Sequence, residues 1–482
     1  MNLPRSVLCR ALAAVVFLFA SVSPAQPDFL IGASPVSVAA PDPAIARALQ
    51  SIEPAAIERT IQALVSFGTR STLSSMEKDL PPGQGINAAA DWIAGQFENI
   101  SNRCGGCLAV HRDTFTEPAV ERIPQPTTIT NVYAVLRGSD PVQARRMVLV
   151  TGHYDSRNSN VLDPRSAAPG ANDDASGVAV SLECARALSK LHLPATVVFV
   201  AVAGEEQGLN GSSHLAKLAK SEGWQLEAVL NNDIVGGNTT PGDTLQLKDR
   251  VRVFSEGMPV AATPEQARRI RALGAENDSP SRELARAIAD TARAYFPAAA
   301  GAPFAAFLVS RPDRYLRGGD HTSFNREGFA AVRFTEWRED FNHQHQNVVL
   351  PAPGSADPIL GDLIQFVDFN YVANVARLNA ATLATLASSP GEPGKVAIVT
   401  KNLENSTTLS WEAPAGAGTG VHYEVLWRET TAADWQFAQT VAAPAAGAPA
   451  TVEVTVPISK DNVIFGVRAV DAAGHRGLAV VP

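Results

Sequence analysis

Short apolar runs alternate with helix-period segments along most of the chain, and this alternation is the first indication of the fold. The run at residues 197–202 contains no polar side chain, which is typical of a strand buried on both faces of a sheet. The strand-like runs lie at 128–136, 146–151, 195–203, 228–233 and 329–335, and the helix-period segments lie within 41–101 and at 175–191, 211–220, 280–294 and 360–386. The pattern predicts an α/β fold with three layers, in which helices cover both faces of a mostly parallel central sheet.

Residues 239–317 fit this alternation poorly. Only 280–294 has a clear helix period there, behind Ser279 or Ser281 as the capping residue. We expect the rest of the segment to be an insertion that shapes a pocket.

A different pattern begins after residues 388–394, a linker of serine, proline, glycine and one glutamate. The following segments alternate apolar with polar residues at short, regular spacing: 396–399, 407–411, 422–428, 435–441, 450–456 and 463–470. They predict an all-β sandwich over 395–482. Trp411, the strand around Tyr423 and the segment 465–474 resemble a fibronectin type III domain, with Phe465 where that family usually has a tyrosine.

Charge and composition narrow the classes of partner. The chain has 482 residues, 45% of them hydrophobic, and a formal net charge of -8. This is enough apolar material for a sizeable core. An acidic surface does not attract polyanions, so we expect neither nucleic acid nor an anionic membrane as a partner.

The N-terminus has the layout of a secretory signal peptide over residues 1–25. Arg5 and Arg10 precede an apolar run at 11–20, and small residues end at Ala25. The run is far shorter than the roughly 20 residues that cross a membrane. We therefore expect a secreted or periplasmic protein with no membrane anchor.

The cysteines that remain after such a cleavage are too few for a disulfide framework. Cys104 and Cys107 are three positions apart, and in an exported protein they are expected to close a small local disulfide loop. Cys184 lies in an apolar helical stretch and is expected to be a buried free thiol.

Acidic and histidine residues gather where the predicted strands end, which is where open α/β sheets bind ligands. The residues are His153, Asp155, Asp173, Asp174, Glu205, Glu206, Asp233, His343 and His345. So many unpaired carboxylates would raise one another's pKa values, and divalent cations are the natural compensation. Imidazole and carboxylate ligands without cysteine fit catalytic zinc. Because the ligands outnumber one tetrahedral shell, we expect two Zn²⁺ ions.

The order of these motifs resembles the co-catalytic zinc exopeptidases that include bacterial leucyl aminopeptidases. The series is His-x-Asp, Asn-Asp-Asp-x-Ser-Gly, Glu-Glu-x-Gly, Asn-x-Asp and a late histidine, within about 41–386. The resemblance implies a zinc metallopeptidase domain over 26–387. It implies that His153 and Asp233 bind one zinc, that Glu206 and the late histidine bind the other, and that Asp173 bridges them.

Three further roles follow from the same resemblance and from the chemistry. Glu205 would be the catalytic base, because its neighbour Glu206 can hold metal while Glu205 stays free to take a proton. Asp155 would orient the imidazole of His153. Asp174 is expected to open the helix at Ala175 rather than to bind metal.

The late histidine has two candidates. Relatives often show His-Thr-x-x-Asp, and His343 matches that register with Asn347 in place of the aspartate. We favour His343 and keep His345 as the alternative. The cluster at 317–324, which contains Asp320 and His321, resembles the segment that borders the substrate pocket in these enzymes, and we expect it to form a pocket wall or a structural turn rather than to supply a sixth ligand.

The function expected from the resemblance is that of an aminopeptidase, which hydrolyses terminal peptide bonds of peptide or protein substrates through a metal-bridged hydroxide. Related enzymes also include carboxypeptidases and a cyclising transferase. A rival of another class is a non-catalytic binding protein, whose C-terminal module contacts a surface or polysaccharide.

Overall fold

The computed structural model describes residues 27–32, 34–297, 303–401, 403–444 and 451–482. The predicted signal peptide at 1–25 lies outside these residues. Within the described part, none of the helices combines the length and the apolar character needed to cross a membrane.

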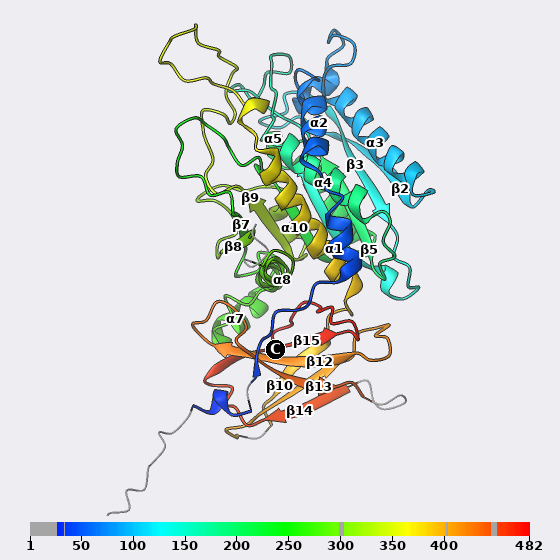
Figure 1. Cartoon of the computed structure of the whole chain (residues 1–482), viewed down its shortest axis with the longest axis vertical. Helices are drawn as coiled ribbons and strands as arrows, with labels where there is room; N and C mark the ends of the chain where they lie inside the picture. The colour runs from blue at the N-terminus through cyan, green and yellow to red at the C-terminus, as the bar shows by residue number, and fades with distance from the viewer. Residues whose placement is uncertain (1–26, 33, 298–302, 402, 445–450) are drawn as a thin grey trace, which may run out of the picture.

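A large mixed sheet forms the centre of the first part of the chain (Figure 1). Its eight strands follow the order β2-β3-β5-β4-β6-β9-β7-β8. Their bounds are β2 (Leu108–Glu117), β3 (Thr127–Leu136), β4 (Arg146–His153), β5 (Thr196–Val202), β6 (Gln225–Asn232), β7 (Arg250–Ser255), β8 (Ala305–Val309) and β9 (Ala331–Thr335).

The sheet is mixed: its central strands agree with the expectation of a mostly parallel sheet, and β7 and β8 at one edge are also parallel to each other. β5, β4, β6 and β9 are parallel to their neighbours within that group. β2, β3 and β7 each join by antiparallel pairing, which needs no long crossover connection. The segment 239–317, expected to be an insertion, supplies both β7 and β8 to the sheet.

Helices cover the sheet on both faces. The bounds are α1 (Pro43–Leu49), α2 (Pro54–Val65), α3 (Ile86–Arg103), α4 (Ala175–Leu188), α5 (Glu205–Gly208), α6 (Asn210–Ser221), α7 (Pro264–Leu273), α8 (Pro280–Tyr295), α9 (His321–Arg326) and α10 (Phe369–Ser388). The larger core joins one face to α1–α4, α8 and α10. A smaller core packs α6 and α9 against the other face.

The C-terminal part consists of two antiparallel sheets that share one apolar core. One sheet has the order β1-β13-β12-β15 and the other β10-β11-β14. Their bounds are β1 (Ser34–Pro35), β10 (Gly394–Val399), β11 (Thr407–Glu412), β12 (His422–Glu429), β13 (Phe437–Ala442), β14 (Thr451–Val456) and β15 (Val463–Val470). Trp411 from one sheet and Tyr423 from the other are fully buried in this core.

Phe29, Ser34 and Pro35 pack with the C-terminal sheets, although the domain predicted from the sequence over 26–387 includes them. β1 pairs with β13 at Ser34 and Pro35. The indole N–H of Trp427 donates to the Phe29 carbonyl at 2.9 Å. These residues are therefore held against the C-terminal sheets.

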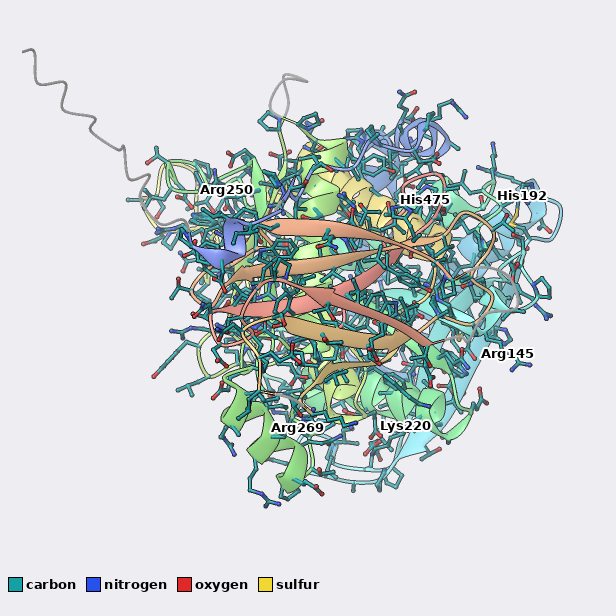
Figure 2. All side chains as sticks on the ribbon, turned by 90° about the horizontal axis from the view of Figure 1, so that it is seen from below. Arg145, His192, Lys220, Arg250, Arg269 and His475 are labelled. Carbon is teal, nitrogen blue, oxygen red and sulfur yellow. A yellow bond between two sulfur atoms is a disulfide. The ribbon has the colours of Figure 1, made fainter. Side chains whose placement is uncertain are left out.

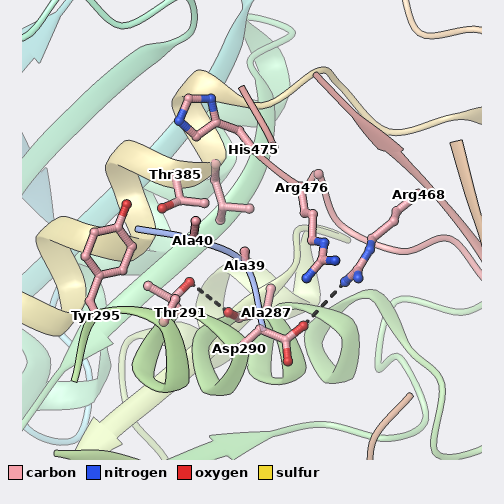
Figure 3. A pocket seen from close by; sticks show the side chains of 14 residues that line it. Ala39, Ala40, Ala287, Asp290, Thr291, Tyr295, Thr385, Arg468, His475 and Arg476 are labelled. Carbon is pink, nitrogen blue, oxygen red and sulfur yellow. Dashed lines mark hydrogen bonds and ion pairs between the residues drawn. The ribbon is translucent and has the colours of Figure 1, made fainter. Parts of the chain in front are cut away.

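The two parts of the molecule meet along α8. Trp435 donates its indole N–H to Glu283 on α8 at 2.9 Å, and the guanidinium groups of Arg286 and Arg428 lie 5.9 and 5.6 Å from the centroid of its ring. Figure 3 shows a second contact at this junction, where Arg468 pairs with Asp290 of α8 at 3.3 Å.

The C-terminal sheets lie at the end of the large sheet where its central strands begin. Arg146, the first residue of β4, donates to the Ser389 carbonyl of the connecting segment at 2.8 Å. Figure 2, which views the molecule from below, shows the C-terminal strands spread across this end. The opposite ends of the central strands, where the predicted site residues lie, are therefore far from these sheets (Figure 1).

The cysteine predictions are confirmed. Cys104 and Cys107 form a disulfide, and Cys184 is a buried free thiol.

Candidate metal centre

The candidate site lies at the carboxyl ends of three neighbouring parallel strands. His153 ends β4, the pair Glu205–Glu206 opens α5 after β5, and Asp233 directly follows β6. Asp173 precedes α4, which follows β4 along the chain. Because these strand ends meet at one edge of the sheet, residues distant in sequence come together.

Five of the predicted residues form two groups that share one carboxylate. His153, Asp173 and Asp233 make one group, and Asp173, Glu206 and His345 make the other, with the possible ligand atoms of each group within 4.8 Å of one another. Asp173 Oδ1 lies 3.1 Å from His153 Nε2, and Asp173 Oδ2 lies 2.9 Å from His345 Nε2. Asp173 thus presents one oxygen to each group, which is the geometry of a bridging ligand.

The residues present fit zinc. His153 Nε2 and Glu206 Oε1 are buried and make no well-oriented hydrogen bond with the described residues, and such atoms in a folded protein call for a partner. The donors are imidazole nitrogens and carboxylate oxygens, which zinc prefers in catalytic sites. Each group can therefore hold one divalent cation.

Asp155 contacts both the ring of His153 and the start of α5. Its carboxylate lies 3.4 Å from His153 Nδ1 and accepts the backbone N–H groups of Glu205 and Glu206 at 3.3 and 3.2 Å. Thr72 donates its hydroxyl to the same carboxylate at 3.0 Å. Asp155 therefore fixes the ring of His153 and the start of α5 together.

Glu205 lies beside the site but belongs to neither group. Its side chain retains some exposure, whereas Glu206 is buried. Burial of its carboxyl raises the pKa of Glu205 well above the usual range, while His153 acts in the opposite direction. A carboxyl group in this position can exchange a proton with a water molecule bound next to it.

The structure places His345, rather than the favoured His343, beside Asp173 and Glu206. His343 stacks on Phe366, with ring centroids 3.5 Å apart, and its Nδ1 faces the Thr240 hydroxyl at 3.1 Å. His345 instead contacts Glu206 Oε1 at 3.1 Å. His345 has a φ of 55°. This left-handed backbone conformation is uncommon for residues other than glycine, and the spacing of residues in the sequence does not predict it. Asn347 also lies apart from both groups and accepts a hydrogen bond from Ser159 at 2.8 Å.

Asp174 has the capping role expected of it. Its carboxylate accepts the N–H of Gly177 at 3.0 Å at the start of α4. It also accepts the N–H of His153 at 3.0 Å, so the same side chain holds the helix to the end of β4. Asp320 and His321 are fully buried at the start of α9, which contacts α6 and β9.

Sequence reasoning missed two residues that hold the loops of the site. Arg70 is fully buried and donates to the carbonyls of Tyr154 and Gly170 at 2.7 and 2.8 Å. Asp362 accepts the backbone N–H of Asp173 at 2.7 Å. Neither residue lies in a motif, and only the folded chain brings them to the site.

Comparison with known proteins identifies the family. The sequence profile described as Peptidase family M28 matches residues 131–349. A "probable zinc metalloprotease" of Pyricularia oryzae is 44% identical over 93% of this chain and 86% of its own length. A second protein of that name, from Leptosphaeria maculans, is 42% identical over 92% of this chain and 97% of its own length.

Solved structures with a similar fold include the LapA aminopeptidase of Legionella pneumophila, with 18% identity, a TM-score of 0.49, and coverage of 73% of this chain and 77% of that one. The family assignment rests on the profile and on the relatives that align along nearly the whole chain. The chain therefore belongs to peptidase family M28 and is a zinc metallopeptidase.

Proposed function

We propose that the protein is an exopeptidase of the aminopeptidase type that uses two zinc ions. The observation that carries the proposal is the pair of ligand groups that share Asp173. His153 and Asp233 would hold one ion, and Glu206 and His345 the other, with Asp173 between them. When bound, two such ions lower the pKa of a water molecule and polarise the substrate carbonyl.

The chain's own residues supply the proton transfers. Glu205 is next to the ligand Glu206 but outside both groups, so its carboxylate is free to take a proton from the attacking water. It then delivers that proton to the leaving amine. Asp155 keeps His153 and the backbone of Glu205 in register through the contacts described above.

A Glu205→Gln variant tests this assignment. Turnover should fall by about 100- to 10,000-fold, the range of general acid–base catalysis, while the zinc content stays near two per chain. Glu265→Gln, at an exposed position of α7, is the matched control and should leave turnover unchanged. Near-normal turnover of Glu205→Gln would exclude Glu205 as the base.

Substrate panels separate the exopeptidase types on this scaffold. We expect hydrolysis of amino-acid anilides, which carry a free amine, and no hydrolysis of N-blocked dipeptides. Cleavage of the blocked dipeptides alone would favour a carboxypeptidase, and cyclisation of N-terminal glutaminyl peptides would favour a cyclotransferase. Purified protein that binds no zinc would support a non-catalytic binding protein.

We also propose that the protein is exported and that residues 395–482 form a fibronectin type III-like sandwich joined by the linker 388–394. The Cys104–Cys107 disulfide supports an oxidising compartment. The antiparallel sheets and their common core support the sandwich. Because these sheets lie away from the candidate metal centre, their outer surface is available to contact a cell surface or polysaccharide while substrate is bound. Co-sedimentation of the intact protein with insoluble polysaccharide tests this contact.

A further inference from the structure

An arginine lies against one of the two ligand groups. Arg333, the third residue of β9, is fully buried. Its Nη2 lies 2.7 Å from Oδ1 of Asp233 and also donates to the Asp233 carbonyl at 3.2 Å. The side chain of Asp233 therefore has a permanent cationic partner.

The surrounding residues keep this guanidinium in place. Nη1 of Arg333 donates to the Gly318 carbonyl at 3.2 Å and lies 3.5 Å from Oδ2 of Asp313. A Cβ atom at Gly319 would lie 2.6 Å from the same Nη1, so the backbone at Gly319 passes close against the guanidinium. Arg333 is thus part of a built contact rather than a side chain free to swing away.

The other ligand group has no such partner. Among the described residues, the only ion-pair partners of the Asp173 and Glu206 carboxylates are the imidazoles of His153 and His345. The nearest arginine contact to Glu206 is that of Arg122 with its backbone carbonyl, at 3.2 Å. One group therefore has a guanidinium against a ligand carboxylate, with Asp313 as the second anionic partner of that guanidinium, and the other group has none.

We infer that Arg333 makes the two metal positions unequal, so that the ion at His153 and Asp233 binds more weakly, loads second and is lost first. The guanidinium carries its charge at every working pH. It repels a cation in the same group and, as an ion pair 2.7 Å from Oδ1 of Asp233, competes with that cation for the carboxylate. Both effects lower the affinity of that position more than that of the position at Glu206 and His345, where no guanidinium contacts a ligand side chain among the described residues.

This inference rests on the proposed two-zinc function and is tested by metal binding rather than by activity. Metal-free, full-length protein is titrated with zinc against a chelator of known affinity, and bound zinc is counted by mass spectrometry. The wild-type protein should show two binding events whose dissociation constants differ by about 10- to 100-fold, the range in which residues outside the metal ligands act. Glu206→Gln should remove the tighter event and Asp233→Asn the weaker one.

Two substitutions of Arg333 separate its charge from its hydrogen bond. Arg333→Gln keeps a donor but removes the charge, and it should tighten the weaker event about tenfold toward the stronger one. Arg333→Lys keeps the charge and should retain the two unequal events. If Arg333→Gln does not fold, the double variant Arg333→Gln with Asp313→Asn restores the balance of buried charge and takes its place.

The outcomes decide the inference separately from the proposed function. A wild-type protein that binds one zinc or none contradicts both. Two zinc ions with equal constants in the wild-type protein overturn the inference and leave the proposed function standing. A folded Arg333→Gln protein with both constants unchanged also overturns it.

Discussion

The buried Arg70 side chain gives the sharpest test of how the loops around the metal centre are held. Its guanidinium donates to four backbone carbonyls, those of Leu64, Tyr154, Pro169 and Gly170. Tyr154 follows His153, and Gly170 lies three residues before Asp173. Arg70 therefore ties together two of the segments that carry predicted ligands.

The cost of an Arg70→Lys substitution can be worked from these contacts. A lysine has at most three donors on one nitrogen, so at least one of the four carbonyls loses its partner. Each buried group left unsatisfied costs about 1–3 kcal/mol. One or two lost partners lower the free energy of unfolding by about 1–6 kcal/mol. At an unfolding entropy of about 2.1 cal/mol/K per residue, this corresponds to a fall in Tm of about 1–6 °C for a chain of 482 residues.

Thermal unfolding of the metal-free protein measures this change directly. Added zinc should restore part of the lost Tm, because a ligand that binds only the native state stabilises it by mass action. Arg59→Lys, at an exposed position of α2, is the control and should leave the Tm unchanged. An Arg70→Lys protein with the Tm of the wild type would refute the claim that the Arg70 guanidinium holds the loops around the metal centre.

Three further predictions concern other parts of the molecule. Burial raises the pKa of Glu256 to about 7, so above that pH the folded protein holds a buried negative charge that opposes folding. Glu256→Gln should therefore raise the Tm at pH 8 but not near pH 4. An equal change at both pH values would contradict this. Trp435→Phe removes the donor to Glu283 and should lower the free energy of unfolding in urea by about 1–3 kcal/mol, whereas no change would argue against this domain contact. His345→Ala should lose one zinc by mass spectrometry while His343→Ala keeps two, and the reverse result would restore the choice of His343.

The central strands were predictable because they are buried on both faces and therefore read as continuous apolar runs. The predicted strand at 146–151 lies within β4, and the run at 195–203 contains β5. The cap of α8 was also predictable, since the Ser279 hydroxyl accepts the N–H of Arg282 at 3.2 Å. Local chemistry decides both kinds of feature.

The features that the sequence did not reveal depend on contacts between distant segments. β1 is two residues long and becomes a strand only because β13 offers it an edge. His343 and His345 differ by a left-handed backbone conformation at His345, and motif register alone favoured the residue that stacks on Phe366. Arg70 is an isolated arginine until the fold surrounds it with carbonyls.

The central claim, two cations that share Asp173, is tested most directly by anomalous diffraction at the zinc edge from crystals grown with zinc. The account predicts two peaks about 3.5–4 Å apart, as in other two-metal hydrolytic sites. One peak should lie within bonding distance of His153 and Asp233, and the other within bonding distance of Glu206 and His345. A single peak, or peaks that do not adjoin Asp173, would contradict the account.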